Sequence, residues 1–167
     1  LDGVIKEFIG ETSKTVLDVA CGIGTQSIGL AKLGYHVTAS DLSSAEIKQA
    51  RQEALRHGVQ IEFHVVDMRH VSETYQRQFD VVIACDNSVP HLLSNDEILL
   101  AFRQFYQCTR SGGCCIITVR DYAQLQRNDQ HKQMYPRLVH PTDSGQIVMF
   151  DVWDFDGDYY EITTYLV

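Results

Sequence analysis

Residues 15–25 combine an acidic side chain with two glycines in an arrangement that favours a small charged ligand. The first half is an apolar run typical of a buried strand and includes Asp18, whereas the second half contains Gly22 and Gly24 and leads into a helical pattern at 26–33. Glycines at a helix start let a ligand approach the backbone and its unpaired N–H groups closely. A carboxylate before them would repel a pyrophosphate but suits a cation such as the amino group of an amino acid. The third glycine of the dinucleotide fingerprint is absent, which argues against a dinucleotide cofactor.

Two further polar segments, 86–91 and 119–122, contain side chains that could orient a small substrate. Arg120 carries a planar guanidinium suited to a carboxylate, Asn87 offers an amide carbonyl to an amine, and His91 could accept a hydrogen bond. Structural roles stay open, because Asn87 and His91 could brace a loop and Arg120 could pair with a neighbouring carboxylate. The seven histidines lack ligand spacing, so we expect no metal site and no nucleophilic triad.

The elements that must position these groups alternate regularly between strand and helix. Apolar runs predict a first strand within 15–25 and four others at 35–41, 59–66, 78–85 and 114–120. Helices are predicted at 26–33, 43–57 and 94–109, the last two opened by capping boxes. This alternation predicts an α/β fold, a Rossmann-like doubly wound parallel sheet with strand order 3-2-1-4-5.

Asp41 and Asp67 follow the second and third predicted strands, at the sheet edge where open α/β folds bind ligands. The Asp41 carboxylate could accept both hydroxyl protons of a ribose, or it could cap a helix. From the sequence pattern alone, Asp67 is an ordinary turn residue.

The C-terminal part of the chain departs from this alternation. Residues 121–144 are polar with two prolines, which predicts a short helix and then a long loop. Two β-rich runs at 146–155 and 158–166, joined by Asp156-Gly157, predict a hairpin that pairs Trp153 with Tyr160. Both of its faces carry apolar side chains, which suggests packing on the domain and on a second subunit as a homo-oligomer. We therefore predict one domain over 1–167, with a cofactor-binding core at 10–122 and the loop and hairpin at 123–167.

Composition excludes several classes of protein. The 167 residues carry 14 Lys and Arg against 22 Asp and Glu, a net charge of −8, which argues against a nucleic-acid-binding surface. No apolar run reaches the roughly 20 residues that span a bilayer, so we expect no membrane segment. Five cysteines without a Cys-x-x-Cys pair favour free thiols in the cytoplasm. The chain starts with Leu and ends after the hairpin, which we interpret as truncation at both ends.

The segment Asp18–Thr25, with the sequence DVACGIGT, resembles the cofactor loop of class I S-adenosylmethionine-dependent methyltransferases. The resemblance implies that the strand acid and the loop bind the methionine end of the cofactor and that Asp41 holds the ribose. It also implies that Asp67 pairs with the adenine amino group and that Met68 packs on the adenine ring. The cofactor-binding residues that it implies are Asp18, Ala20, Cys21, Gly22, Gly24, Asp41, Leu42, Asp67, Met68 and Cys85.

A narrower resemblance links residues 84–93, 118–122 and 150–158 to glycine and glycine/sarcosine N-methyltransferases. It implies that Asn87 and Arg120 bind the substrate and that His91 lies beside it. The expected activity is methyl transfer from S-adenosylmethionine to the amine of glycine, sarcosine or dimethylglycine, as in betaine synthesis, with S-adenosylhomocysteine as product. The alternatives are a methyltransferase for another small metabolite, a degenerate cofactor-binding module and, more distantly, an NAD-dependent oxidoreductase. The N-terminal aromatic segment and the C-terminal helix and strands of that family have no counterpart in these 167 residues.

Overall fold

A computed structural model describes residues 1–11, 15–122, 132–142, 145–157 and 159–167. The chain divides into two compact units, Leu1–Arg120 and Asp121–Val167. The boundary lies close to position 122, where the sequence predicts the end of the cofactor-binding core.

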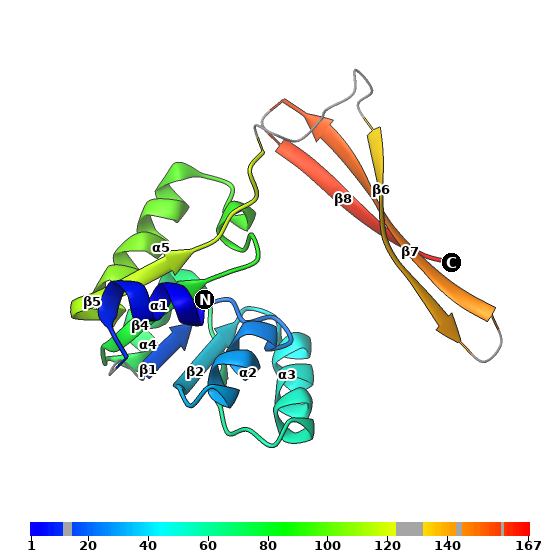
Figure 1. Cartoon of the computed structure of the whole chain (residues 1–167). Helices are drawn as coiled ribbons and strands as arrows, with labels where there is room; N and C mark the ends of the chain where they lie inside the picture. The colour runs from blue at the N-terminus through cyan, green and yellow to red at the C-terminus, as the bar shows by residue number, and fades with distance from the viewer. Residues whose placement is uncertain (12–14, 123–131, 143–144, 158) are drawn as a thin grey trace. The chain divides into compact units, whose positions relative to one another are not determined.

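The first unit contains a five-stranded parallel sheet (Figure 1). Its strands are β1 (Thr15–Asp18), β2 (His36–Asp41), β3 (Glu62–Val65), β4 (Phe79–Ala84) and β5 (Thr109–Ile117). The spatial order is β3-β2-β1-β4-β5, and every neighbouring pair is parallel. The predicted doubly wound topology is confirmed. In this order β1 lies between β2 and β4, so the loops that follow these three strands are neighbours at one edge of the sheet.

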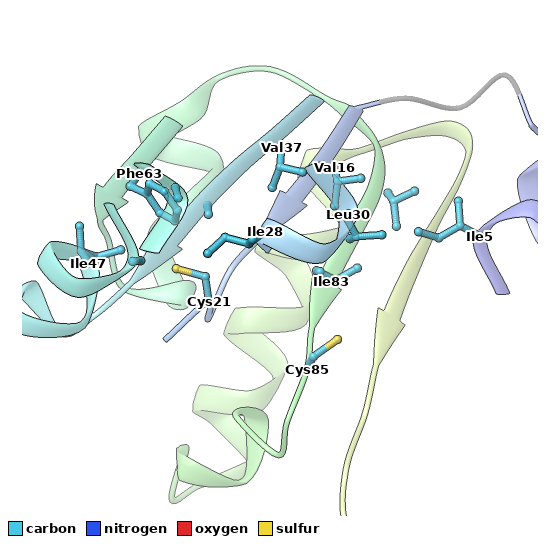
Figure 2. Packing of buried hydrophobic residues seen from close by; sticks show 14 residues of the cluster. Ile5, Val16, Cys21, Ile28, Leu30, Val37, Ile47, Phe63, Ile83 and Cys85 are labelled. Carbon is cyan, nitrogen blue, oxygen red and sulfur yellow. The ribbon is translucent and has the colours of Figure 1, made fainter. Parts of the chain in front are cut away.

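Helices cover both faces of this sheet. The elements are α1 (Asp2–Ile9), α2 (Thr25–Lys32), α3 (Ser44–Arg56), α4 (Val71–Tyr75) and α5 (Asn95–Cys108), with short 3₁₀ turns η1 (Met68–His70) and η2 (Val89–His91). Ile5, Ile28 and Ile47 from α1, α2 and α3 pack in one buried cluster with Val16 and Ile83 of the sheet (Figure 2). A second cluster joins α4 and α5 to the sheet through other strand residues. The core is therefore two apolar layers, one against each face of the sheet.

The serine half of each predicted capping box forms, whereas the Ser43 N–H pairs with Asp41 and the Glu97 carboxylate accepts the Leu93 N–H. The Ser43 hydroxyl accepts a hydrogen bond from the backbone N–H of Glu46 at 3.3 Å, and the Ser94 hydroxyl accepts one from Glu97 at 3.2 Å. These contacts satisfy N–H groups that the first helical turn leaves unpaired. They fix where α3 and α5 begin, directly after the loops that follow β2 and β4.

The fifth strand begins earlier than predicted. The sequence predicts a turn at 111–113 before a strand at 114–120, whereas β5 starts at Thr109 and contains a register shift opposite Phe79 and Val81. A Cβ atom at Gly113 would lie 2.6 Å from the backbone oxygen of Asp80, so glycine lets the two strands approach at this irregularity. Because β5 ends at Ile117, Arg120 lies in the segment after the strand.

The second unit is a three-stranded antiparallel sheet of β6 (Lys132–Thr142), β7 (Gly145–Asp156) and β8 (Tyr159–Leu166), in the order β6-β7-β8. The predicted hairpin corresponds to β7 and β8. The prediction of a long loop before the hairpin is wrong for residues 132–142. These residues form β6, which pairs with β7 along its full length. Pro136 and Pro141 conceal this strand in the sequence, but an edge strand tolerates proline because one of its sides has no partner strand. The predicted short helix falls largely on 123–131, outside the described residues.

The hairpin register differs from the prediction by two residues. Trp153 lies opposite Ile162 rather than Tyr160, and the last pair before the turn is Asp156 with Tyr159. A shift of two residues keeps every side chain on its predicted face, because the side-chain period of a strand is two. Trp153 still stacks on Tyr160, with ring centroids 4.8 Å apart, as a diagonal neighbour. This aromatic packing gives the small sheet a core of its own.

Candidate active site

Asp18 ends β1 and is almost completely buried, with 1% of its surface exposed. Its carboxyl accepts a hydrogen bond from the Ser27 hydroxyl at 2.7 Å and another from the backbone N–H of Ala20 at 3.3 Å. Burial, with a smaller contribution from the nearby acids Asp41 and Asp86, raises the pKa of Asp18 to about 7 against the lowering effect of the two hydrogen bonds. Because this pKa lies close to neutral pH, a cationic ligand beside Asp18 would favour the ionised carboxylate.

The glycine loop after Asp18 has a conformation that side chains would disturb. Gly22 has a φ of 53°, and Gly24, the N-cap of α2, has a φ of 90°. A Cβ atom on Gly24 would lie 3.3 Å from the Ala50 Cβ atom and from the Ile28 Cδ1 atom. The loop thus brings the N-terminus of α2 against α3 and forms a compact backbone cradle.

Asp41, at the end of β2, holds this cradle in place. Its two oxygens accept hydrogen bonds from the backbone N–H groups of Gly22 and Ser43, both at 2.9 Å. Each carboxylate oxygen has a second lone pair, so the group can still accept hydroxyl protons from a ligand. Leu42, beside it, is 69% exposed. The cap of α3 is Ser43 rather than Asp41, and the hydrogen bonds by which Asp41 braces the loop are compatible with a ligand role.

Asp67 forms the N-cap of η1, accepting the backbone N–H of Arg69 at 2.9 Å. The Arg69 side chain also binds this carboxylate, with Nη2 2.6 Å from Oδ2. The adjacent guanidinium lowers the pKa of Asp67, so the carboxylate is ionised at neutral pH. Met68 is partly buried against the second core cluster. The Arg69 contact was not predicted, although the Asp-x-Arg spacing is visible in the sequence.

The loop after β4 is joined to the segment after β5 by three hydrogen bonds. The Thr118 hydroxyl and carbonyl accept the N–H groups of Asp86 and Asn87, at 2.9 and 3.1 Å. The Asn87 side-chain oxygen accepts the Arg120 N–H at 3.0 Å. Asp86 and Asn87 both have positive φ, of 56° and 68°, which Asp and Asn tolerate better than most residues. Asn87 therefore joins the loop after β4 to the segment that carries Arg120, a contact that the sequence did not predict, and Thr118 is an additional residue that sequence reasoning missed.

The remaining predicted site residues differ in exposure. Cys21 and Cys85 are buried, and desolvation raises the pKa of the Cys85 thiol to about 11, so it is not ionised at neutral pH. His91 closes η2, and both His91 and Arg120 are exposed to solvent. The Gln26 side chain donates to the Asp86 carboxylate at 3.3 Å and so connects the start of α2 to the loop after β4. This hydrogen bond joins the helix that follows the glycine loop to the loop that the sequence predicts to contact the acceptor.

Within the part of the chain that the structure describes, no group of three or more His, Cys, Asp or Glu side chains could hold a metal ion. No helix among the described residues has the length and hydropathy needed to cross a membrane.

A doubly wound sheet with a glycine cradle, a buried acid before it and an acid at the end of the next strand defines a nucleoside-cofactor site of the methyltransferase type. Residues 16–113 match the family model described as a methyltransferase domain. The chain belongs to the class I S-adenosylmethionine-dependent methyltransferase family, as predicted, and S-adenosylmethionine is the cofactor of that family.

Individual relatives agree with this assignment. The glycine/sarcosine N-methyltransferase of Aphanothece halophytica is 32% identical over 118 residues, 71% of this chain and 44% of that protein. A ubiquinone biosynthesis O-methyltransferase of Hydrogenovibrio crunogenus is 33% identical over 88 residues, 53% of this chain and 36% of that protein. The chain thus matches less than half the length of these curated relatives. In fold, it is similar to S-adenosylmethionine-bound CalS10, an amino pentose methyltransferase from Micromonospora echinaspora, with a TM-score of 0.75 and 16% identity over 99% of this chain and 71% of that one.

Proposed function

We propose that this protein transfers a methyl group from S-adenosylmethionine to the amine of a small amino acid, namely glycine, sarcosine or dimethylglycine. The observation that carries the proposal is the hydrogen bond from the Arg120 backbone N–H to the Asn87 side-chain oxygen, which places Arg120 beside the loop after β4. The similarity to a glycine/sarcosine N-methyltransferase supports it.

The chain has side chains that complement the amino and hydroxyl groups of the cofactor. Asp18 is a buried acid suited to the cationic amino group, and Asp41 has acceptor positions left for the ribose hydroxyls. Gly22 and Gly24 have positive φ values that side chains disfavour, and the bare backbone of this cradle suits close approach of a ligand. When bound, S-adenosylmethionine supplies a methyl group activated for direct displacement, so the protein needs alignment and charge complementarity rather than a nucleophile.

Arg120 is the residue that would bind the acceptor carboxylate, because its planar guanidinium can form two parallel hydrogen bonds to it. Asn87 would align the amine from the opposite side, while its oxygen also braces the Arg120 backbone. His91 would lie beside the acceptor as a neutral orienter. We also propose that the protein acts in the cytoplasm and that the second unit contributes to a homo-oligomer.

The test is transfer of labelled methyl groups by the purified protein with glycine, sarcosine and dimethylglycine in separate reactions, beside a control without acceptor. We expect labelled product with at least one acceptor. Arg120→Ala should raise KM for the acceptor by about 10²-fold, since a charged hydrogen-bond partner is lost. Arg103→Ala, which removes an exposed arginine of α5, is the matched control and should leave KM unchanged.

A different small metabolite is the second candidate acceptor, favoured by the similarity to an O-methyltransferase of ubiquinone biosynthesis. On that alternative the three amino acids give no product, and Arg120→Ala leaves activity on the true acceptor intact. A degenerate cofactor-binding module would bind the cofactor and methylate no acceptor at all.

A further inference from the structure

Three charged side chains form a half-buried network that connects the end of β3 to the start of α5. Arg69 is its centre, and we call the set Asp67, Arg69 and Glu97 the Arg69 bridge. The Arg69 Nε atom lies 3.0 and 3.1 Å from the two Asp67 oxygens, and Nη2 lies 2.6 Å from Oδ2. The other terminal nitrogen, Nη1, binds a Glu97 carboxylate oxygen. One guanidinium thus holds two carboxylates from segments 30 residues apart in the chain.

Glu97 carries this connection into the loop that follows β4. Its second oxygen accepts the backbone N–H of Leu93 at 3.1 Å, and its own N–H is capped by Ser94. Leu93 lies two residues after His91, so the Glu97 carboxylate fixes the end of the segment that begins at Asp86. The start of the same segment is fixed by Thr118.

Asp67 receives a defined orientation from the bridge. The Arg69 backbone and side chain engage it together, and the side chain is the main reason that the pKa of Asp67 is low. The side chains of Arg69, Asp67 and Glu97 are 30%, 19% and 35% exposed, so solvent screens the network only in part. The carboxylate is therefore held in one place and in one charge state.

We propose that Arg69 is a positioning residue for both substrates: it orients Asp67 toward the cofactor and, through Glu97, sets the end of the acceptor loop. This inference rests on the proposed function, in which the loop after β4 faces the acceptor, and on the pairing of Asp67 with the adenine amino group that the family resemblance implies. In this proposal Arg69 acts through Asp67 and Glu97 rather than by contact with either ligand. Its removal would release the Asp67 carboxylate and the Leu93 end of the loop together.

A structural ion pair elsewhere in the same unit provides a matched control. Arg77 Nη2 lies 2.7 Å from a Glu62 oxygen and 2.8 Å from the Thr38 hydroxyl. Glu62 starts β3 and Arg77 precedes β4, so this pair lies at the amino ends of the strands, at the sheet edge opposite Asp67. Substitution of Arg69 and of Arg77 therefore removes an arginine and its ion pair at opposite edges of the same sheet. The effects of the two substitutions on ligand binding can be compared.

The first experiment is calorimetric titration of the protein with S-adenosylhomocysteine, which needs no acceptor. Arg69→Gln should weaken binding about tenfold, and Arg69→Lys, which keeps the charge but not the planar fork, should fall between this variant and the wild type. Arg77→Gln should stay within about twofold of the wild type, and thermal unfolding identifies any variant that fails to fold. Equal affinities for Arg69→Gln and the wild type, or equal losses for Arg69→Gln and Arg77→Gln, would overturn the proposal.

The second experiment separates the two ends of the bridge. Glu97→Gln keeps the Asp67–Arg69 pair, so the affinity for S-adenosylhomocysteine should stay within about twofold while KM for the acceptor rises about fivefold. The double variant Arg69→Gln/Glu97→Gln should raise KM for the acceptor no further than Arg69→Gln alone, because both changes break one connection. Additive effects on KM would contradict the link through Glu97. If none of the three amino acids is methylated, the proposed acceptor is wrong, whereas the titration still decides the role of Arg69 on the cofactor side.

Discussion

Asp18 combines two properties that rarely occur together, a carboxyl group and almost complete burial. Two hydrogen bonds to its oxygens favour the charged form, but desolvation outweighs them and holds the pKa at about 7. A bound ammonium group would shift this balance toward the carboxylate. The residue therefore links cofactor binding to proton release.

We expect cofactor affinity to depend on pH through Asp18. The carboxylate is the form that binds a cation, so affinity should be highest above pH 7 and fall about tenfold per pH unit as the pH drops below the pKa. Calorimetric titration with S-adenosylhomocysteine between pH 5.5 and 8.5, in buffers of different ionisation enthalpy, would measure both the affinity and the proton released. Asp18→Asn should bind weakly at every pH, and equal wild-type affinities at pH 6 and pH 8 would contradict this account.

Glycine is needed at position 24 but not at position 29 of the same helix. Gly24→Ala combines a φ of 90° with two contacts at 3.3 Å, so it should lower the free energy of unfolding by about 1–3 kcal/mol and weaken cofactor binding. Gly29→Ala has open space around its Cβ atom and should raise stability by about 0.5–1 kcal/mol. Urea unfolding of both variants measures the difference. A Gly24→Ala protein as stable as the wild type would show that the loop relaxes.

At the scale of elements, the site depends on loops that follow neighbouring strands and are tied to one another. Thr118 is central to this arrangement, since it accepts two N–H groups from the loop after β4 while its own N–H pairs with Ala84. The positive φ values at Asp86 and Asn87 are maintained by these bonds.

Thr118→Val should therefore loosen the loop after β4, which carries Asp86 and Asn87, without changing the fold. It removes the hydroxyl that accepts the Asp86 N–H, and we expect KM for the acceptor to rise about fivefold to tenfold while cofactor affinity stays the same. Thr118→Ser keeps the hydroxyl and should behave like the wild type. Steady-state kinetics with both substrates varied separates the two parameters, and an equal loss of affinity for both ligands would argue for a general structural role.

The elements that could be predicted are those in which local pattern and tertiary structure agree. The strands β1 to β4, the capping serines and the strand order follow from apolar periodicity and the right-handed crossover rule. The start of β5 and the strand β6 were missed because glycines and prolines normally end strands, whereas here Gly113 permits a bulge and Pro136 lies on an edge strand. Hairpin register depends on which residues form the turn, and the Asp-Gly pair does not determine it alone.

Individual side-chain partners were less predictable than the elements. The positions of Asp18, Asp41 and Asp67 at strand ends could be predicted, because parallel strands bring their carboxyl ends to one edge. The contacts of Arg69 with Glu97 and of Asn87 with Arg120 join segments about 30 residues apart, and no local spacing encodes such pairs. Their functional roles at the site stay predictions until the variants are measured.

At the scale of the whole molecule, the two units have separate cores and different structural content. Every residue assigned to the cofactor lies in Leu1–Arg120, and all helices among the described residues lie there as well. The described part of Asp121–Val167 is built from strands around Trp153, Phe155 and Tyr160.

The chain has a single tryptophan, Trp153, and its side chain is only 4% exposed. Fluorescence excited at wavelengths selective for indole therefore follows the surroundings of Trp153 in the second unit, whereas helical circular dichroism follows the first unit, which contains all helices among the described residues. We expect two unfolding midpoints in urea that do not coincide, with S-adenosylhomocysteine raising the one seen by circular dichroism. Coincident midpoints would mean that the units unfold as one. Where the two midpoints differ, a stability screen that read tryptophan fluorescence alone would follow the unfolding of the second unit and miss a ligand that stabilises the first.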